Sequence, residues 1–120
     1  MDDATLLEEA RRAAERSYSP YSGFAVGAAV LARDGRVFHG TNVENASYGL
    51  TLCAERAALA RAVAEGVRPG DVEAVAVTAS PCGGCRQWLA ELRVGRVVFP
   101  LGGEVVVRRP DELLPDSFEL

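Results

Sequence analysis

Two short runs constrain this chain most, because together they hold all three of its cysteines. The first is Cys53-Ala54-Glu55, and the second, Pro81-Cys82-Gly83-Gly84-Cys85, begins twenty-six residues after Glu55. Three thiolates can bind one Zn²⁺ and leave a fourth position open for water, which is the arrangement of a catalytic rather than a structural zinc. The fold must therefore bring two segments that are far apart in the sequence to one point.

Glu55 is the only acidic residue in either run. A carboxylate beside a zinc-bound water can accept a proton from it and pass that proton on. Cys53 and Glu55 are two positions apart and would not share a face of a regular helix. The proton-carrying role therefore requires Cys53 to lie at the very start of a helix, where the direction of a side chain is less constrained.

Arg56 follows Glu55 directly and is the nearest candidate for a positive charge beside the cysteines. Three thiolates give a zinc centre a net negative charge, which weakens the metal as an acidifier of water. The Arg56 guanidinium could hydrogen-bond the thiolates and restore some Lewis acidity from outside the coordination sphere. Helix N-termini, where we expect all three cysteines, also lower the pKa of a thiol and favour the thiolate.

Length and charge exclude several classes of protein. A chain of 120 residues can bury a core and fits one domain over residues 1–120. Its net charge of −4 argues against a nucleic-acid partner, because such proteins usually carry a clustered basic face. No apolar run approaches the roughly 18 residues of a membrane span. The acidic start of the chain lacks the features of a secretory signal, so we expect a cytoplasmic protein without a membrane partner.

Hydrophobic periodicity and turn signals predict an α/β fold. A helix capped by Asp2 or Asp3 is expected to run to about Arg16. The other expected elements are strands at 24–32, 36–40, 72–79, 96–100 and 104–107, and helices at 51–65 and from the cysteine loop to about 93. The last two strands are separated by only three residues, so they should be antiparallel. This order predicts a mixed sheet with helices against its faces.

The expected helix at 51–65 is apolar nearly all round, which predicts burial on more than one side. Its many alanines would permit close contact with another helix, including one across a subunit interface. In the following helix, Trp88, Leu89 and Leu92 are expected to belong to the core. We assign no function to Trp88.

Other interpretations of the three cysteines stay open at this point. They could be buried core thiols, and Cys82 and Cys85 alone could form a redox pair, since Cys-x-x-Cys is also a redox pattern. A closed structural zinc site with His39 as the fourth ligand is a further alternative, because three cysteines and one histidine form a known structural set. The odd number of cysteines favours metal binding or catalysis over a framework of disulfides.

With these residues placed, the chain resembles the small, homotetrameric, zinc-dependent cytidine deaminases over almost its whole length. The pair Cys-Ala-Glu and Pro-Cys-x-x-Cys is typical of the deaminase superfamily, and the run Asn-Val-Glu-Asn-Ala from Asn42 narrows it to nucleosides. The matching stretches are 19–24, 26–29, 42–48, 53–56, 81–87 and 113–115, followed by Phe118.

The resemblance implies a three-layer α/β/α sandwich with a five-stranded mixed sheet. It implies one zinc ion per subunit on Cys53, Cys82 and Cys85, with Glu55 as the catalytic residue. It further implies that Asn42 and Glu44 bind the ribose hydroxyls, that Phe24 stacks on the base, and that active sites of a homotetramer are completed by neighbouring subunits. The residues expected to bind substrate are Phe24, Asn42, Glu44, Tyr48, Ala54 and Phe118, of which Tyr48 and Phe118 would reach across an interface.

The expected reaction is hydrolytic deamination of cytidine and 2′-deoxycytidine to uridine and 2′-deoxyuridine, with release of ammonia, in pyrimidine salvage. Zinc would lower the pKa of its bound water, and the resulting hydroxide would attack the ring carbon that carries the amino group. Glu55 would take the water proton, deliver it to ring nitrogen 3 and then pass a proton to the departing ammonia.

Two alternative functions stay open. One is a deaminase of another cytosine nucleoside, such as blasticidin S. The other, from a different class, is a zinc-stabilised interaction module without catalysis. The module predicts that His39→Ala releases zinc while Glu55→Gln changes nothing, and the deaminase interpretation predicts the reverse.

Overall fold

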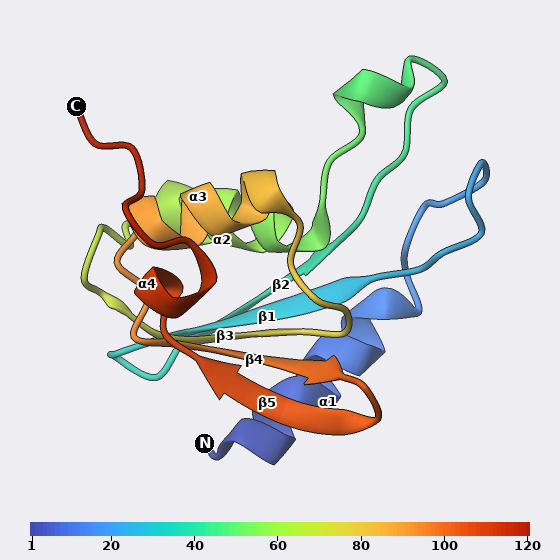
Figure 1. The fold of residues 1–120 in the computed structure, drawn as a ribbon. Helices are drawn as coiled ribbons and strands as arrows, with labels where there is room; N and C mark the ends of the chain where they lie inside the picture. The colour runs from blue at the N-terminus through green and yellow to red at the C-terminus, as the bar shows by residue number, and fades with distance from the viewer.

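The computed structural model describes the whole chain, Met1–Leu120, and is built on one five-stranded sheet with the order β2-β1-β3-β4-β5 (Figure 1). Strand β1 (Gly27–Ala32) pairs antiparallel with both β2 (Val37–Thr41) and β3 (Val72–Val77). Strand β4 (Arg96–Leu101) runs parallel to β3, and β5 (Glu104–Arg108) returns antiparallel along β4. The predicted mixed five-stranded sheet is confirmed.

Helices cover both faces of this sheet (Figure 1). Helix α1 (Asp3–Ala14) packs on one face, and α2 (Ala54–Ala64) and α3 (Gly83–Glu91) lie over the other. Each interface has its own buried cluster. Leu6, Leu7 and Val98 belong to the cluster under α1, and Leu59, Leu89 and Phe99 belong to the larger cluster under α2 and α3. The predicted three-layer α/β/α sandwich is therefore confirmed.

Helix α1 forms where the sequence predicts it. The Asp2 carboxylate accepts a hydrogen bond of 2.8 Å from the Thr5 amide and so satisfies one of the free N–H groups of the first turn. Buried residues at helical spacing (Leu6, Leu7, Ala10 and Ala13) then face the sheet. The helix ends at Ala14, two residues before the predicted boundary.

Two glycines let helices approach the sheet closely. A Cβ on Gly27 would lie 2.0 Å from the carbonyl oxygen of Ala10 in α1. A Cβ on Gly40 in β2 would lie 2.4 Å from the amide nitrogen of Ala58 in α2. Gly40 thus sets how near α2, which carries Glu55, can lie to the sheet.

The expected strand at 24–32 begins three residues late, at Gly27. The side chain of Asn42 takes the place of a strand partner for the preceding residues. It accepts a hydrogen bond of 2.9 Å from the Val26 amide and donates one of 2.8 Å to the Phe24 carbonyl oxygen. The backbone groups of residues 24–26 are therefore hydrogen-bonded to a side chain instead of to a neighbouring strand, and these residues form part of a loop.

The helix expected from Thr51 begins at Ala54. The backbone before it is extended, because Leu52 and Val43 exchange two hydrogen bonds of 2.9 Å. The later starts of β1 and α2 lengthen the two loops that precede them, residues 17–26 and 42–52. These loops project together beyond the sheet (Figure 1). The second loop includes a 3₁₀ turn at Tyr48–Leu50.

One burial prediction was wrong. Trp88 is 38% exposed rather than part of the core, because the buried positions of α3 are Cys85 and Leu89, and Trp88 points away from them. Helix α2 buries one face within this chain, whereas Ala60 and Ala64 on its outer side are exposed. Leu89 and Leu92 are buried as predicted.

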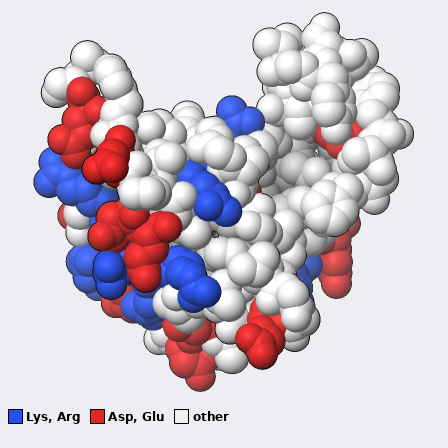
Figure 2. Space-filling view, viewed as in Figure 1, with Lys and Arg blue, Asp and Glu red and all other residues white.

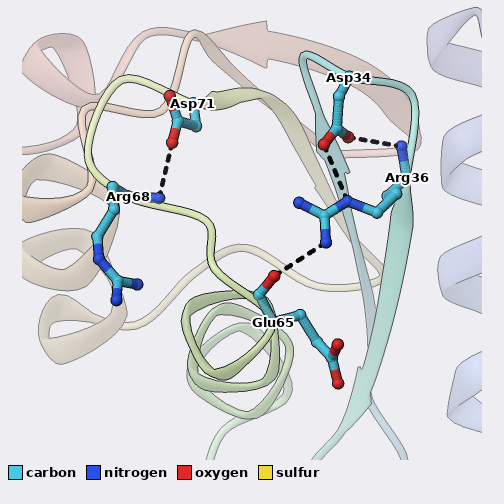
Figure 3. A network of polar contacts seen from close by, with 5 residues as sticks. All are labelled: Asp34, Arg36, Glu65, Arg68 and Asp71. Atoms are coloured by element: carbon cyan, nitrogen blue, oxygen red, sulfur yellow. Dashed lines mark hydrogen bonds and ion pairs between the residues drawn. The ribbon is translucent and has the colours of Figure 1, made fainter.

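The end of the sheet remote from the two projecting loops is held by a polar network (Figure 3). Arg36, which follows the β1–β2 turn, donates to Asp34 at 2.9 Å and to the Glu65 carbonyl oxygen at the end of α2, also at 2.9 Å. The Arg68 amide donates to Asp71 at 2.9 Å and closes the next turn. The chain ends in a short helix, α4 (Pro110–Leu113), and a tail. None of the helices has the length and apolar character needed to span a bilayer.

Candidate metal centre and active site

The three cysteines meet at the start of two helices. Cys53 is the N-cap residue of α2 and Cys82 is the N-cap residue of α3, with Cys85 in the first turn of α3. The loop after β3 delivers Cys82, and the second projecting loop delivers Cys53. Cys53 therefore lies where the role of Glu55 requires it, directly before the first helical turn.

The sulfur positions fit a tetrahedral metal. The Sγ atoms of Cys53 and Cys82 lie 3.8 Å apart, those of Cys82 and Cys85 lie 3.4 Å apart, and all three lie within 4.8 Å of one another. Zn–S bonds of about 2.3 Å in tetrahedral geometry place two sulfurs about 3.8 Å apart. The donor set and its spacing therefore suit zinc, with one position left for another ligand.

The thiols of α3 have opposite pKa shifts. Burial raises the pKa of Cys82, but hydrogen bonds from the Cys85 amide and from neighbouring thiols lower it more, so that it lies below its ordinary value. Burial, followed by the negative charge of Glu55, raises the pKa of Cys85 far above its ordinary value. A cation at the centre of the three sulfurs would reverse this penalty, because it favours the thiolate.

Arg56 contacts the cysteine cluster from the side of α2. Its Nη2 atom donates to the Cys53 sulfur at 3.2 Å and to the Thr51 carbonyl oxygen at 3.2 Å. The contact with Cys53 is the main reason why the pKa of Arg56 is raised, so the guanidinium stays charged. Its Nε atom is buried without a hydrogen-bond partner.

Glu55 is 3% exposed, an unusual state for a carboxylate, and lies in the first turn of α2 beside the cysteines. Burial raises its pKa above the ordinary value, and hydrogen bonds from its own backbone amide and from the Cys85 thiol, together with the charge of Arg56, oppose this only in part. A buried carboxyl group with a raised pKa accepts a proton more readily than a solvated one. Glu55 is therefore not an ordinary solvated helix residue.

A cleft of about 250 Å³ opens between the metal centre and the two projecting loops. Figure 2 shows the hollow beside the loops, which carry few charged atoms on this face. Of the residues expected to bind substrate, all but one line this cleft: Phe24, Asn42, Glu44, Tyr48 and Ala54. Cys53, Cys82 and Glu55 line it as well, so the metal centre and the expected substrate site form one space.

Asn42 and Glu44 are both buried in the wall of the cleft. The Asn42 amide oxygen accepts from the Val26 amide and from the Ser17 hydroxyl, and one amide hydrogen is donated to Phe24. The second amide hydrogen of Asn42 is left for a ligand. Asn42 therefore shapes the loop and keeps one donor for binding.

Glu44 is fixed by the other projecting loop. Its Oε1 atom accepts hydrogen bonds from the amides of Tyr21 and Ser22 at 2.9 and 3.1 Å. Its Oε2 atom accepts from the Ser22 hydroxyl, and from the Tyr48 hydroxyl at 3.4 Å. The hydroxyl of Ser22 holds the pKa of Glu44 below its usual range.

The sequence does not indicate the roles of Ser17 and Ser22. Their contacts with Asn42 and Glu44 join positions 25 and 22 residues apart. Serine is common in loops for local reasons, so neither residue gave a signal of its own. The matched stretch at 19–24 contains Ser22 but does not indicate its partner.

Phe118 lies outside the cleft. It is 69% exposed on the C-terminal tail, and its carbonyl oxygen accepts a hydrogen bond of 3.1 Å from Gln87 in α3. Phe118 thus makes no contact with the substrate site of its own chain.

His39 cannot complete the metal centre. Its Nε2 atom lies 3.7 Å from a Glu9 carboxylate oxygen on α1, on the opposite face of the sheet from the cysteines. The alternative of a closed site with three cysteines and His39 is therefore wrong. The redox-pair alternative leaves unexplained why the Cys53 sulfur lies as close to Cys82 as a shared metal requires.

Comparison with known proteins agrees with this geometry. Residues 1–101 match the family model described as the cytidine and deoxycytidylate deaminase zinc-binding region. A cytidine deaminase of Halalkalibacterium halodurans is 50% identical over 127 residues, covering 98% of this chain and 95% of the relative. One of Mycobacterium tuberculosis is 45% identical over 124 residues, covering 96% and 88%.

Solved structures give the same result. The crystal structure of cytidine deaminase from Burkholderia pseudomallei matches with a TM-score of 0.91 and 49% identity, covering 98% of this chain and 100% of that one. The Mycobacterium tuberculosis enzyme matches with a TM-score of 0.85 and 44% identity, covering 100% and 99%. The chain therefore belongs to the cytidine and deoxycytidylate deaminase family.

Proposed function

We propose that this enzyme catalyses the hydrolytic deamination of cytidine and 2′-deoxycytidine to uridine and 2′-deoxyuridine. The observation that carries the proposal is the single cleft in which a buried carboxylate, Glu55, lies beside a metal centre while polar groups line the opposite wall. The similar proteins named cytidine deaminases support cytidine as the substrate. The extension to 2′-deoxycytidine and a place in pyrimidine salvage belong to the same proposal.

Cys53, Cys82 and Cys85 would hold the zinc ion. When bound, zinc supplies an acidified water and so a nucleophile at neutral pH. Glu55 accepts the proton of this water and donates it to ring nitrogen 3 of the cytosine. The water oxygen bonds to the ring carbon that carries the amino group, and the bond from this carbon to the amino nitrogen breaks. Glu55 carries the second water proton to the departing amine, which leaves as ammonia.

The remaining residues bind and orient. Phe24, which lines the cleft and is 62% exposed, is available to stack on the base. The spare amide hydrogen of Asn42 and the fixed carboxylate of Glu44 suit ribose hydroxyls, which need both donors and acceptors. Ala54 lines the cleft at the start of α2, next to Glu55. Arg56 offsets part of the negative charge of the thiolates.

We further propose that residues 1–120 form one domain that assembles as a homotetramer with shared active sites. Large apolar side chains are exposed on both projecting loops and on α3, including Tyr18, Tyr21, Tyr48, Leu50 and Trp88. Exposed apolar surface of this extent is typical of subunit interfaces. Phe118 would then reach a neighbouring site, and its position outside its own cleft supports this. Tyr48, by contrast, lines the cleft of its own chain, where its hydroxyl contacts Glu44. Three cysteines kept as thiolates suit the reducing cytoplasm.

The decisive experiment follows the ultraviolet absorbance of cytidine with wild type and with Glu55→Gln, and measures zinc in both. Glutamine keeps the shape of glutamate but cannot carry the proton. We expect wild type to release ammonia with one zinc per chain, and Glu55→Gln to keep its zinc and lose at least about a thousandfold in kcat.

Two outcomes would contradict the proposal. A wild-type protein that holds zinc but leaves cytidine and 2′-deoxycytidine unchanged would show that the substrate is wrong, and other cytosine nucleosides would then be tested. Full activity in Glu55→Gln would remove the proton-carrying role.

A further inference from the structure

Ser22 contacts both Glu44 and Phe24, which in the proposed function bind the ribose and the base of the substrate. Its hydroxyl donates a hydrogen bond to Oε2 of Glu44, the proposed ligand of the ribose. The same hydroxyl oxygen accepts a hydrogen bond of 3.0 Å from the backbone amide of Phe24, the proposed platform for the base. One hydroxyl group thus connects the two walls of the site.

Glu44 depends on this contact because no cation faces it. The carboxylate is 4% exposed, and no arginine or histidine forms an ion pair with it. A buried carboxylate without a counter-ion must be stabilised by N–H and O–H donors. Ser22 supplies two of the four donors that Glu44 receives, its amide to Oε1 and its hydroxyl to Oε2.

The hydroxyl also decides the orientation of the carboxylate. The amides of Tyr21 and Ser22 hold only Oε1. Without the Ser22 hydroxyl, Oε2 would keep only the long contact of 3.4 Å with Tyr48. The carboxylate could then rotate about its Oε1 anchor, and the direction in which its lone pairs meet a ligand would no longer be fixed.

Phe24 depends on the same group for a different reason. Its ring is largely exposed and does not pack in either buried cluster. Its position is therefore set by its backbone, which is held by Asn42 at the carbonyl oxygen and by Ser22 at the amide.

We propose that Ser22 is a positioning residue for substrate binding, whose hydroxyl holds the Glu44 carboxylate and the Phe24 backbone in one arrangement. This inference rests on the proposed deaminase function and adds a residue to it. It places the effect of Ser22 in binding the nucleoside rather than in the chemical step, because the hydroxyl contacts neither the cysteines nor Glu55.

The test compares cytidine deamination by wild type, Ser22→Ala and Ser22→Thr. Alanine removes the hydroxyl and leaves the backbone donors, whereas threonine keeps a hydroxyl at this exposed position. We expect Ser22→Ala to raise KM about tenfold, the usual consequence of losing a hydrogen bond to a charged group. We expect kcat to change by less than about twofold, as for a residue that acts on binding. Ser22→Thr should restore KM.

Ser47→Ala is the matched control, because it removes a serine hydroxyl that makes no hydrogen bond within the chain from the other projecting loop. It should leave KM and kcat unchanged. Thermal unfolding of every variant checks that the fold is kept.

A second readout separates positioning from general loosening of the loop. The same variants are tested with 2′-deoxycytidine and with 3′-deoxycytidine, and kcat/KM is compared. The decrease in kcat/KM caused by Ser22→Ala should be smaller for the nucleoside that lacks the hydroxyl bound by Glu44.

An equal penalty on all three nucleosides would overturn the proposal, as would an unchanged KM for cytidine or a failure of threonine to restore it. If wild type deaminated none of the three nucleosides, the proposed function itself would fail.

Discussion

Single side chains in this site serve the fold and the ligand at the same time. Asn42 uses three of its four hydrogen-bonding positions to replace a missing strand partner, and Glu44 uses both oxygens to tie one projecting loop to the other. Substituting either residue would therefore lower stability and binding together. Arg56 is different, because its contacts are with the metal centre and with one carbonyl oxygen nearby.

Arg56→Gln tests whether a positive charge beside Cys53 sustains catalysis. Glutamine cannot place a charge 3.2 Å from the sulfur, so the thiolates would neutralise more of the charge of the zinc ion. We expect kcat to fall about tenfold or more, in line with the loss of one charged hydrogen bond. Less effective acidification of water should also move the rising limb of the pH–rate profile to higher pH. Steady-state kinetics across pH measures both effects.

Arg16→Gln is the matched control for this change. Arg16 follows α1, and its side chain is exposed and forms no ion pair or hydrogen bond. It should leave the pH profile in place, and zinc content should stay at one per chain in both variants. An unshifted profile and unchanged kcat in Arg56→Gln would remove the charge-offsetting role.

At the scale of elements, the contact between β2 and α2 fixes the position of the site. Gly40→Ala would place a methyl group 2.4 Å from the Ala58 amide nitrogen and 2.5 Å from the Ala54 carbonyl oxygen. Both atoms belong to the backbone, so α2 must move away from the sheet and take Cys53 and Glu55 with it. We expect unfolding to become about 1–3 kcal/mol easier, the usual cost of overpacking, and zinc affinity to fall. Urea titration and competition with a chelator measure these effects.

Gly49→Ala provides the comparison, because a Cβ there meets nothing within 4 Å and Gly49 has no positive φ. Its stability and zinc affinity should match those of wild type. If Gly40→Ala also unfolded and bound zinc as wild type does, the close approach of α2 to β2 would not be what positions the site.

The elements that the sequence predicted well are those in which local pattern and tertiary packing agree. Helix α1 has both a cap at Asp2 and a regular apolar face. The predicted boundaries failed at 24–26 and 51–53, where the backbone pairs with Asn42 and with Val43. Asn42 lies 16 or more residues from its partners, and Val43 lies 9 residues from Leu52, so no local sequence pattern reveals these contacts. The cluster of three cysteines was predictable because metal binding demands particular residue types at a fixed spacing.

At the scale of the whole molecule, much of what the single chain leaves exposed is apolar. Trp88 was predicted to be buried because of its residue type. It is exposed because it lies on a different side of α3 from the buried Cys85 and Leu89, and the sequence does not specify which side of a helix faces the core. The outer face of α2 carries Ala60 and Ala64, and helix faces of this kind allow close packing against another helix. Both features have one explanation in the proposed homotetramer, in which these surfaces would meet a neighbouring subunit.

Ala60→Glu tests this assembly. A carboxylate on the outer face of α2 would have to be desolvated in a helix–helix interface, which costs several kcal/mol per ion, yet it is harmless on an exposed helix. We expect sedimentation to show loss of the tetramer, with secondary structure and zinc retained because the metal centre lies within one chain. Activity should fall with the tetramer, since Phe118 would no longer reach a neighbouring cleft. Ala4→Glu, the same change on the exposed side of α1, should leave assembly and activity unaltered. A wild-type protein that sediments as an active monomer would reject the shared site, and a fully assembled Ala60→Glu would show that α2 lies outside the interface.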